Sequence, residues 1–391
     1  MGNSGGKEET QRKQKESHVT SDMSAVLDEL RKLQTKPKNV LSVERSDITG
    51  SALPYFKTAG CEYSPLEIVL TTEGVKEQYT DLGGPTREFF TLFFKELLRK
   101  DIDMFEGQDQ GRNLLPVNND KAITGQLFAI LGKALVVSLI SGGPGFPYLA
   151  PCVVSYIRDR EYEHELSIGQ VYNTILRQLI KRINYAETQA KLEEALDSDT
   201  ERFIDNCGWP RYQMITIENR LQLTQTLLRW ELIGKRVSAL DQLKKGLNTL
   251  SFLERTANIP EANDTLLHTN AEKATAEYLK KRLKNELDKL KALNETEENA
   301  KKFTMSCMEM MTDTEATHLF HFITGMSSLP VEDMPLEVEF NRSNKSAQLP
   351  EAITCIQRLK IPLGNESPIA LYSSFHKALS VGRYGFGGKE V

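Results

Sequence analysis

The spacing of apolar residues along the chain predicts helices over most of its length and strands in only a few short runs. Residues 22–35 place four apolar side chains on one helical face, which predicts a short amphipathic helix that needs a surface to dock on. Residues 1–24 carry almost no large apolar side chain, and the first aromatic residue is Tyr55. We therefore expect residues 1–54 to be a disordered tail that contains this one short helix.

Between residues 55 and 250 the pattern is that of a large, mainly helical unit. Residues 66–70 (LEIVL) predict a strand, and Gly83-Gly84 predict a tight turn before a helix at 85–98. The charged positions of that helix form one narrow stripe, so most of its surface should be buried. Further helical runs are expected at 123–140, 168–205 and 216–250.

The rest of the chain predicts a smaller unit in which helices and strands mix. Residues 271–293 predict an amphipathic helix with a solvated basic face, and 294–302 (NETEENAKK) contain one apolar residue, which is typical of an exposed connector. The fold class that we expect is α+β, with the large unit at 55–295 and the small α/β unit at 303–391. The elements expected in the small unit are helices at 303–325 and 368–380 and strands at 336–340 and 356–361.

Composition narrows the function classes. The 391 residues include 49 Lys and Arg against 54 Asp and Glu, a net charge of −5, which argues against nucleic acid as a partner of the whole chain. The five cysteines are isolated and no histidine lies at metal-ligand spacing from them, so we expect no metal, no cofactor and a reducing cytoplasmic or nuclear location. The most apolar run, 127–140, is too short to cross a membrane.

Cys355 is the candidate catalytic nucleophile. It follows Leu349-Pro350 and precedes an apolar run, so a loop held by rigid elements would display its thiol. The neighbouring Arg358 and Lys360 could favour the thiolate form. The alternative is that Cys355 is a small buried hydrophobe, as most isolated cysteines are.

Other polar residues make weaker candidates. His318 and His321 lie three apart on a predicted helix, but no third metal ligand is near them in the sequence. The cluster at 161–165 is more typical of a solvated turn, and Asp81 of a turn or helix cap, than of a general base.

Several segments, in the right order, resemble the catalytic domain of HECT-type ubiquitin ligases. Residues 80–90 (TDLGGPTREFF) resemble the family's early signature, and residues 322–330 (FITGMSSLP) its F-x-T-G…P segment. Residues 349–355 (LPEAITC) match the active-site pattern, and residues 385–387 (GFG) match the terminal motif. Residues 142–147 (GGPGFP) are most similar to the G2/M phase-specific group of these ligases.

The resemblance implies a bilobal fold in which an N-lobe at 55–295 and a C-lobe at 303–391 are joined by a hinge at 296–302. A ubiquitin-conjugating enzyme would dock on a subdomain within about 155–215. Cys355 would accept ubiquitin from that enzyme as a thioester and pass it to a lysine of a protein substrate. Neither nucleic acid nor a membrane is an implied partner.

Two departures from the family pattern motivate an alternative. Ile353 stands where family members usually carry His, Ser or Asn, and Phe386 is followed by five residues. The alternative is a catalytically weak or inactive HECT-like module that binds a conjugating enzyme or ubiquitin. A third hypothesis is a cysteine hydrolase that pairs Cys355 with a distant histidine such as His376, which no family pattern supports.

Overall fold

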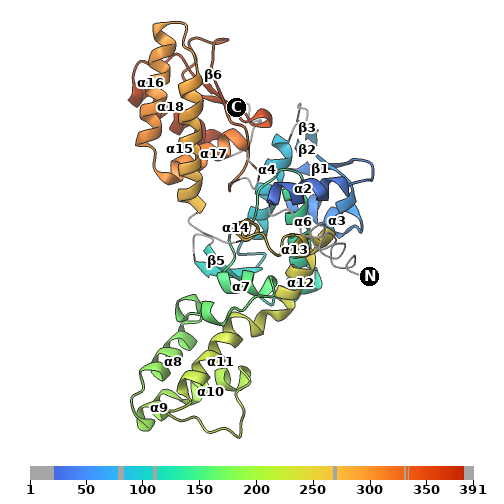
Figure 1. The fold of residues 1–391 in the computed structure, drawn as a ribbon, viewed down its shortest axis with the longest axis vertical. Helices are drawn as coiled ribbons and strands as arrows, with labels where there is room; N and C mark the ends of the chain where they lie inside the picture. The colour runs from blue at the N-terminus through green and yellow to red at the C-terminus, as the bar shows by residue number, and fades with distance from the viewer. Residues whose placement is uncertain are drawn as a thin grey trace, which may run out of the picture.

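The computed structural model describes residues 22–77, 83–108, 112–266, 271–329, 332 and 334–382. These residues are mostly helical with a few short strands, which agrees with the expected mixture of α and β structure. Their buried hydrophobic side chains form two clusters, one from Met23 to Leu266 and one from Ala276 to Leu379, which we call the first and second cores. In Figure 1 the elements of the second core lie above those of the first, and a helical subdomain extends below.

Residues 22–57, predicted to lie largely in a disordered tail, are folded onto the first core. Helix α2 (Met23–Lys32) is capped by Asp22 and buries its apolar face. Strand β1 (Asn39–Glu44) pairs in parallel with β2 (Leu66–Thr72), which also pairs with β3 (Val75–Lys76), and α3 (Ile48–Lys57) packs beside them. The helix predicted at 22–35 is therefore confirmed, whereas the disorder predicted for residues 36–54 is wrong, because they form β1 and part of α3. Residues 1–21 lie outside the described part of the chain.

Helix α4 (Gly84–Leu97) lies at the centre of the first core. Eleven of its residues are buried, which confirms the prediction that most of its surface is covered. The Phe89 and Phe93 rings stack at 5.8 Å between centroids, and Phe56 of α3 stacks on Phe93 at 5.7 Å. Buried aromatic groups of this kind supply a large share of the hydrophobic stabilisation, so α4 is a rigid support for whatever its ends contact.

A close helix crossing completes the first core. Helix α6 (Leu127–Ile140) packs against α12 (Val237–Leu247), and glycines stand where they meet. A Cβ on Gly132 would lie 2.5 Å from the Leu247 nitrogen, and a Cβ on Gly246 would lie 2.2 Å from the Ala129 oxygen. Only glycine permits this approach. Helix α6 is the most apolar of the described helices, yet none of them has both the length and the hydropathy of a membrane span.

The remaining elements of this part include the hairpin β4 (Phe105–Gln108) with β5 (Arg112–Pro116). The four helices between residues 174 and 232 form what we call the lower subdomain. The predicted run at 168–205 is three helices there, because Asn173, Thr188 and Asp197 each cap a new N-terminus with a side-chain oxygen. The bounds are α5 (Asp120–Thr124), α7 (Pro151–Ile157), α8 (Thr174–Tyr185), α9 (Gln189–Ala195), α10 (Ser198–Asn206), α11 (Arg220–Leu232), α13 (Phe252–Arg255) and α14 (Glu261–Asp264).

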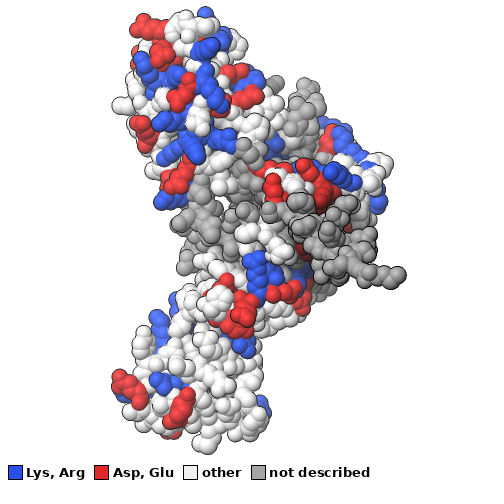
Figure 2. Space-filling view, viewed as in Figure 1, with Lys and Arg blue, Asp and Glu red and all other residues white. Residues whose placement is uncertain are grey.

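Four helices and a sheet enclose the second core. Helix α15 (Ala271–Lys289) packs on α17 (Asp313–Thr324), and α16 (Glu295–Met310) on α18 (Pro368–Gly382). Strand β8 (Arg358–Ile361) lies between β6 (Glu337–Phe340), to which it is parallel, and β7 (Glu351–Ile353), to which it is antiparallel. Helix α15 has the expected amphipathic pattern, and Figure 2 shows basic side chains, with acidic ones among them, over this part of the surface.

The exposed connector predicted at 294–302 is instead the N-cap and first half of α16. Asn294 caps this helix by accepting from the Glu297 N–H at 2.9 Å, and three glutamates occupy its first turn, where the helix dipole favours them. The acidic composition therefore marks a helix start. Because Leu279, Leu283 and Leu287 of α15 belong to the second core, the change from one core to the other occurs earlier in the chain than the predicted boundary at 295.

Candidate active site

Cys355 lies on a one-turn 3₁₀ helix (Thr354–Ile356) that connects β7 to β8. Its side chain is neither buried nor fully exposed, whereas Cys61, Cys152 and Cys307 are buried. Burial raises the pKa of those three thiols to about 11, 12 and 12, which keeps them protonated at neutral pH. Cys355 therefore differs from these three cysteines in lying on a partly exposed turn between two strands.

The turn that carries Cys355 rests on the N-terminal end of α4. Arg87 donates from Nη2 to the Thr354 carbonyl oxygen at 2.6 Å and, more weakly, to that of Cys355 at 3.4 Å. Its Nε donates to the Thr324 oxygen at 2.9 Å. One guanidinium thus joins the first core to two separate segments around the second.

Gly84 lets the turn at Thr354–Ile356, which we call the reactive turn, approach α4 closely. A Cβ on Gly84 would lie 3.0 Å from Cys355 Sγ, 3.0 Å from the Cys355 nitrogen and 2.8 Å from Thr354 Oγ1. Gly325, which ends α17 with a φ of +77°, faces the same helix end, since its Cβ would lie 3.5 Å from the Gly84 oxygen. Both glycines serve close contact between the two parts of the chain.

Glu88, which follows Arg87 in the sequence, points into the first core. Arg45 binds it through two hydrogen bonds of 2.7 and 3.2 Å and also pairs with Glu77. These carboxylates raise the pKa of Arg45 above its ordinary value against the effect of burial. The two residues of the Arg-Glu sequence signature therefore have different contacts. Arg87 binds the reactive turn, and Glu88 attaches α4 to Arg45.

Gln357 completes the reactive turn and carried no signal in the sequence. It adopts a left-handed conformation with φ 49°, and its amide donates to the Thr354 and Cys355 oxygens at 3.2 and 3.0 Å. Each of these carbonyls therefore accepts from both Gln357 and Arg87. Arg358 and Lys360, predicted to favour the thiolate, instead pair with Glu337 and Glu339 across the β6–β8 strands.

Comparison with known proteins bears on this arrangement. The sequence pattern of the family described as "HECT-domain (ubiquitin-transferase)" matches residues 91–388. The chain belongs to the HECT-domain family. This confirms the resemblance noted in the sequence and its assignment to a family of ubiquitin transferases.

Curated relatives of this HECT chain carry the name G2/M phase-specific E3 ubiquitin-protein ligase. The human protein is 25% identical over 362 residues, which are 89% of this chain and 48% of the relative. The Macaca fascicularis protein is 25% identical over 364 residues, again 89% and 48%, and the Gallus gallus protein is 23% identical over 317 residues, 79% and 41%. The chain thus spans about half the length or less of the curated relatives that it matches.

The other candidates from the sequence do not join Cys355 in the HECT structure. His376 pairs with Glu315 at 2.7 Å, and the Tyr372 hydroxyl donates to the same carboxylate. These polar contacts connect α17 to α18. His318 and His321 share α17, and the described residues contain no cluster of potential metal ligands. Glu161 and its neighbours lie on a surface turn before α8, and Asp81 and residues 385–387 lie outside the described residues.

His321 has an unusual environment near the junction with α4. Burial and the positive charge of Lys95 lower its pKa to about 4. Its Nδ1 atom is buried and makes no hydrogen bond to the described residues. The imidazole is therefore neutral at physiological pH, which the H-x-x-H spacing in the sequence did not reveal.

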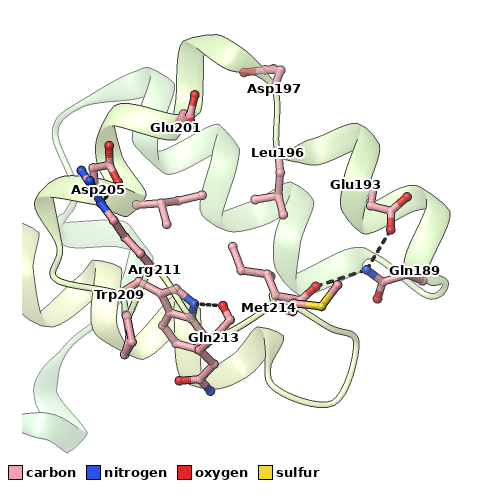
Figure 3. Close-up of a pocket in the computed structure, with 13 residues that line it drawn as sticks. Gln189, Glu193, Leu196, Asp197, Glu201, Asp205, Trp209, Arg211, Gln213 and Met214 are labelled. Carbon is pink, nitrogen blue, oxygen red and sulfur yellow. Dashed lines mark hydrogen bonds and ion pairs between the residues drawn. The ribbon is translucent and has the colours of Figure 1, made fainter.

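A second surface of interest lies on the lower subdomain, within the range predicted to dock a conjugating enzyme. A hollow of about 900 Å³ lies between α9, α10 and the segment 209–215 (Figure 3). The segment is braced by hydrogen bonds from Trp209 Nε1 to the Gln213 oxygen at 3.0 Å and from Gln189 to the Ile215 oxygen at 3.2 Å. On it stand Tyr212, 92% exposed, and Met214, 81% exposed.

Proposed function

We propose that this chain is the catalytic part of a HECT-type ubiquitin-protein ligase in which Cys355 carries ubiquitin as a thioester. The observation that supports this most strongly is the position of Cys355 on a partly exposed turn, in a chain that belongs to the HECT-domain family. The partners implied are a ubiquitin-conjugating enzyme, ubiquitin and a protein substrate with an acceptor lysine.

The first step exchanges one thioester for another. The Cys355 thiolate attacks the carbonyl carbon that links ubiquitin to the cysteine of the conjugating enzyme. The new S–C bond forms, the old S–C bond breaks, and the conjugating enzyme leaves as a thiolate. Because the bond formed and the bond broken are of the same kind, the protein's main task is to bring two sulfur atoms within reach of one carbonyl.

The second step delivers ubiquitin to an amine. A neutral lysine amine attacks the same carbonyl carbon, an amide C–N bond forms, and Cys355 leaves as a thiolate while the amine proton passes to solvent or a base. Ubiquitin is thereby joined to the substrate by an amide. Stabilisation of the leaving thiolate and correct placement of its turn are what the protein can contribute to this step.

We propose that the first and second cores are the two lobes of the family's bilobal fold. In support, the buried apolar residues up to Leu266 form one cluster and those from Ala276 onward form another. The hinge expected at 296–302 would lie within α16. The polar contacts of Arg87 and of its neighbours on α4 would then be the contacts that form and break as the lobes move.

The conjugating enzyme would dock on the lower subdomain. Tyr212 and Met214 are large apolar side chains that are almost fully exposed on a braced segment, and such residues are typical of protein-binding surfaces. The hollow beside this segment is lined by carboxylates, so the surface offers both apolar and acidic groups to a partner (Figure 3).

A location in the cytoplasm or nucleus is part of the proposal. All five cysteines, the half-exposed Cys207 and Cys355 among them, are free thiols. A reducing compartment would keep Cys355 available for acylation. Localisation of the tagged full-length protein by microscopy would test this.

The decisive experiment is a gel assay for the thioester. The protein is mixed with ubiquitin, activating enzyme, ATP and a panel of conjugating enzymes, and the products are separated with and without reductant. We expect a ubiquitin adduct that reductant removes and that Cys355→Ala abolishes, while Cys207→Ala, at another half-exposed cysteine, leaves it intact. Absence of the adduct with every conjugating enzyme would overturn the proposal.

A second candidate function is a HECT-like module that binds a conjugating enzyme or ubiquitin without efficient transfer. Ile353, the last residue of β7, favours it because an apolar side chain two positions before Cys355 supplies no hydrogen bond to the reactive turn. Calorimetric binding of a conjugating enzyme together with no adduct would support this function. If Ile353→Ser increased the rate of adduct formation, the sequence departure would be the cause of a slow reaction.

A further inference from the structure

We infer that Arg87 is a positioning residue for Cys355, which holds the reactive turn on α4 for the second transfer, from Cys355 to the substrate amine. The inference rests on the proposed function, since it assigns a role within that reaction. It also makes a statement about the structure alone, namely that Arg87 controls how the Cys355 thiol is presented. The two parts can be tested separately.

The contacts between α4 and the second core lie on one face of the helix. Gly84, Arg87 and Thr91 follow one another at intervals of three and four residues, which places them in a row. Gly84 meets the turn at Cys355, and the Thr91 hydroxyl donates to the Gly325 oxygen at 2.9 Å. Arg87 stands between them and reaches both the turn and the end of α17.

Arginine is suited to this place by its shape. The side chain is 6% exposed, and its planar guanidinium directs donors to two sides at once, toward Thr324 and toward Thr354. Gln357 binds the same carbonyls of the turn from within the second core, so the turn has an internal brace of its own. What Arg87 adds is the placement of the turn relative to α4.

The position of the contact indicates which step it serves. The proposed docking surface for the conjugating enzyme is on the lower subdomain, whereas the Cys355 turn contacts α4 and α17 at the other end of the first core (Figure 1). To receive ubiquitin the turn must leave α4 and approach the carrier. Contact with α4 therefore belongs to the step after loading, in which the C–S bond breaks and sulfur leaves with the electron pair.

The local charge fits that assignment. Cys355 Sγ lies beside the first residue of α4, at the positive end of a 14-residue helix, and the Arg87 guanidinium holds the same turn. Positive charge from both therefore lies close to the turn. When the lysine nitrogen bonds to the carbonyl carbon, the developing charge on sulfur is therefore stabilised where the turn is held.

Single-turnover kinetics on the full chain test the role in the reaction. Arg87→Gln and Gly84→Ala are compared with Arg99→Gln, which alters an exposed arginine near the other end of α4 that pairs with Glu96 and Asp101. We expect Arg87→Gln to slow discharge of the charged enzyme to free lysine about tenfold while loading changes less than about threefold. Equal loss in both steps, or no loss in discharge, would overturn the inference.

A chemical measurement tests the structural part without ubiquitin. The rate of Cys355 alkylation by iodoacetamide is followed by peptide mass spectrometry in a Cys207→Ser background. We expect Arg87→Gln to raise this rate severalfold and Arg99→Gln to leave it unchanged, because the turn is no longer held on α4. An unchanged rate for Arg87→Gln would overturn the inference even if the enzyme is active.

Gly84→Ala guards against loss of folding. Gly84 lacks a positive φ, and alanine favours a helix over glycine, so this variant should keep α4 intact while its Cβ displaces the Cys355 turn. It should therefore reproduce both effects of Arg87→Gln with an unchanged melting temperature. If wild-type protein forms no thioester, the proposed function fails, and the alkylation rates alone decide whether Arg87 places the turn.

Discussion

Arg87 and Thr354 are 267 positions apart in the sequence and are joined by a hydrogen bond of 2.6 Å from the guanidinium to the main-chain oxygen. The next residue is Cys355, so a side chain of α4 fixes the backbone that presents the thiol. The conformation of the reactive turn therefore depends on contacts from both cores. Its reactivity should respond to any change that alters how the cores meet.

A second link between the cores is an ion pair that starts on α2. Arg31 binds Glu332 through Nη1 and Nη2 and also donates from Nε to the Ile140 oxygen at 2.9 Å. Both side chains are about 30% exposed, so we expect the pair to stabilise the folded chain by about 1 kcal/mol. A double-mutant cycle with Arg31→Gln and Glu332→Gln, read by thermal unfolding, should give a coupling energy of this size.

That coupling should shrink in about 0.5 M salt, because salt screens partly exposed charges. Asp28→Asn, which removes the exposed carboxylate on the other side of Arg31, is the matched control and should cost little. Strictly additive effects of Arg31→Gln and Glu332→Gln would show that the pair does not hold the cores together.

The first core contains a fully buried arginine whose loss should be severe. Arg236 is 1% exposed and donates to the Pro116 oxygen at 2.7 Å, to the Glu231 oxygen at 3.0 Å and to the Glu106 carboxylate. Arg236→Met would leave these acceptors without their donor in the interior. We expect a loss of about 3–5 kcal/mol, seen as a lowered midpoint of chemical unfolding.

Arg229→Met is the comparison for that experiment. Arg229 lies on the same segment of chain, is 56% exposed and is 3.5 Å from Glu163. Its replacement should change stability by less than about 0.5 kcal/mol. Similar effects of the two substitutions would mean that the buried network around Arg236 does not stabilise the fold.

How far the sequence predicts this fold depends on whether the signal is local. The burial of α4 was predictable because its apolar residues occupy nearly every face. The acidic run at 294–302 has a composition that is typical of both a linker and a helix N-terminus. The helix forms because the Asn294 side chain accepts a hydrogen bond from the Glu297 N–H and caps its first turn. The role of α2 could not be predicted, since its partner surface is built from distant residues.

The residues of the candidate active site likewise differ in whether the sequence could reveal them. Cys355 was identified because Pro350 and the apolar run beyond it frame the turn, and the family resemblance named its chemistry. Arg87 belonged to a recognised motif, but its contact lies 267 residues away. Gln357 carried no signal at all, because its task depends on a left-handed backbone conformation that its residue type does not indicate.

The neutral His321 predicts how stability depends on pH. Its pKa is lowered to about 4 in the folded chain, below the value near 6.5 of an unfolded histidine. Between pH 4 and 6.5 His321 is protonated in the unfolded chain but neutral in the folded chain. The stability that the neutral His321 contributes to the folded chain is therefore complete above pH 6.5 and is lost as the pH falls toward 4. The slope should be at most about 1.4 kcal/mol per pH unit. His321→Gln should flatten the curve of melting temperature over this interval, and an unchanged curve would refute the assignment.

The proposed docking surface makes the last prediction. Tyr212 and Met214 are 92% and 81% exposed, so replacing either by alanine should leave the melting temperature unchanged. If they form the centre of the conjugating-enzyme interface, each substitution should weaken binding about tenfold or more, a loss of at least 1.4 kcal/mol. Isothermal titration calorimetry with a conjugating enzyme measures this, and Ile369→Ala, which removes a 72% exposed apolar side chain on α18, is the control. Equal affinity for the Tyr212, Met214 and Ile369 variants would place the docking surface elsewhere on the chain.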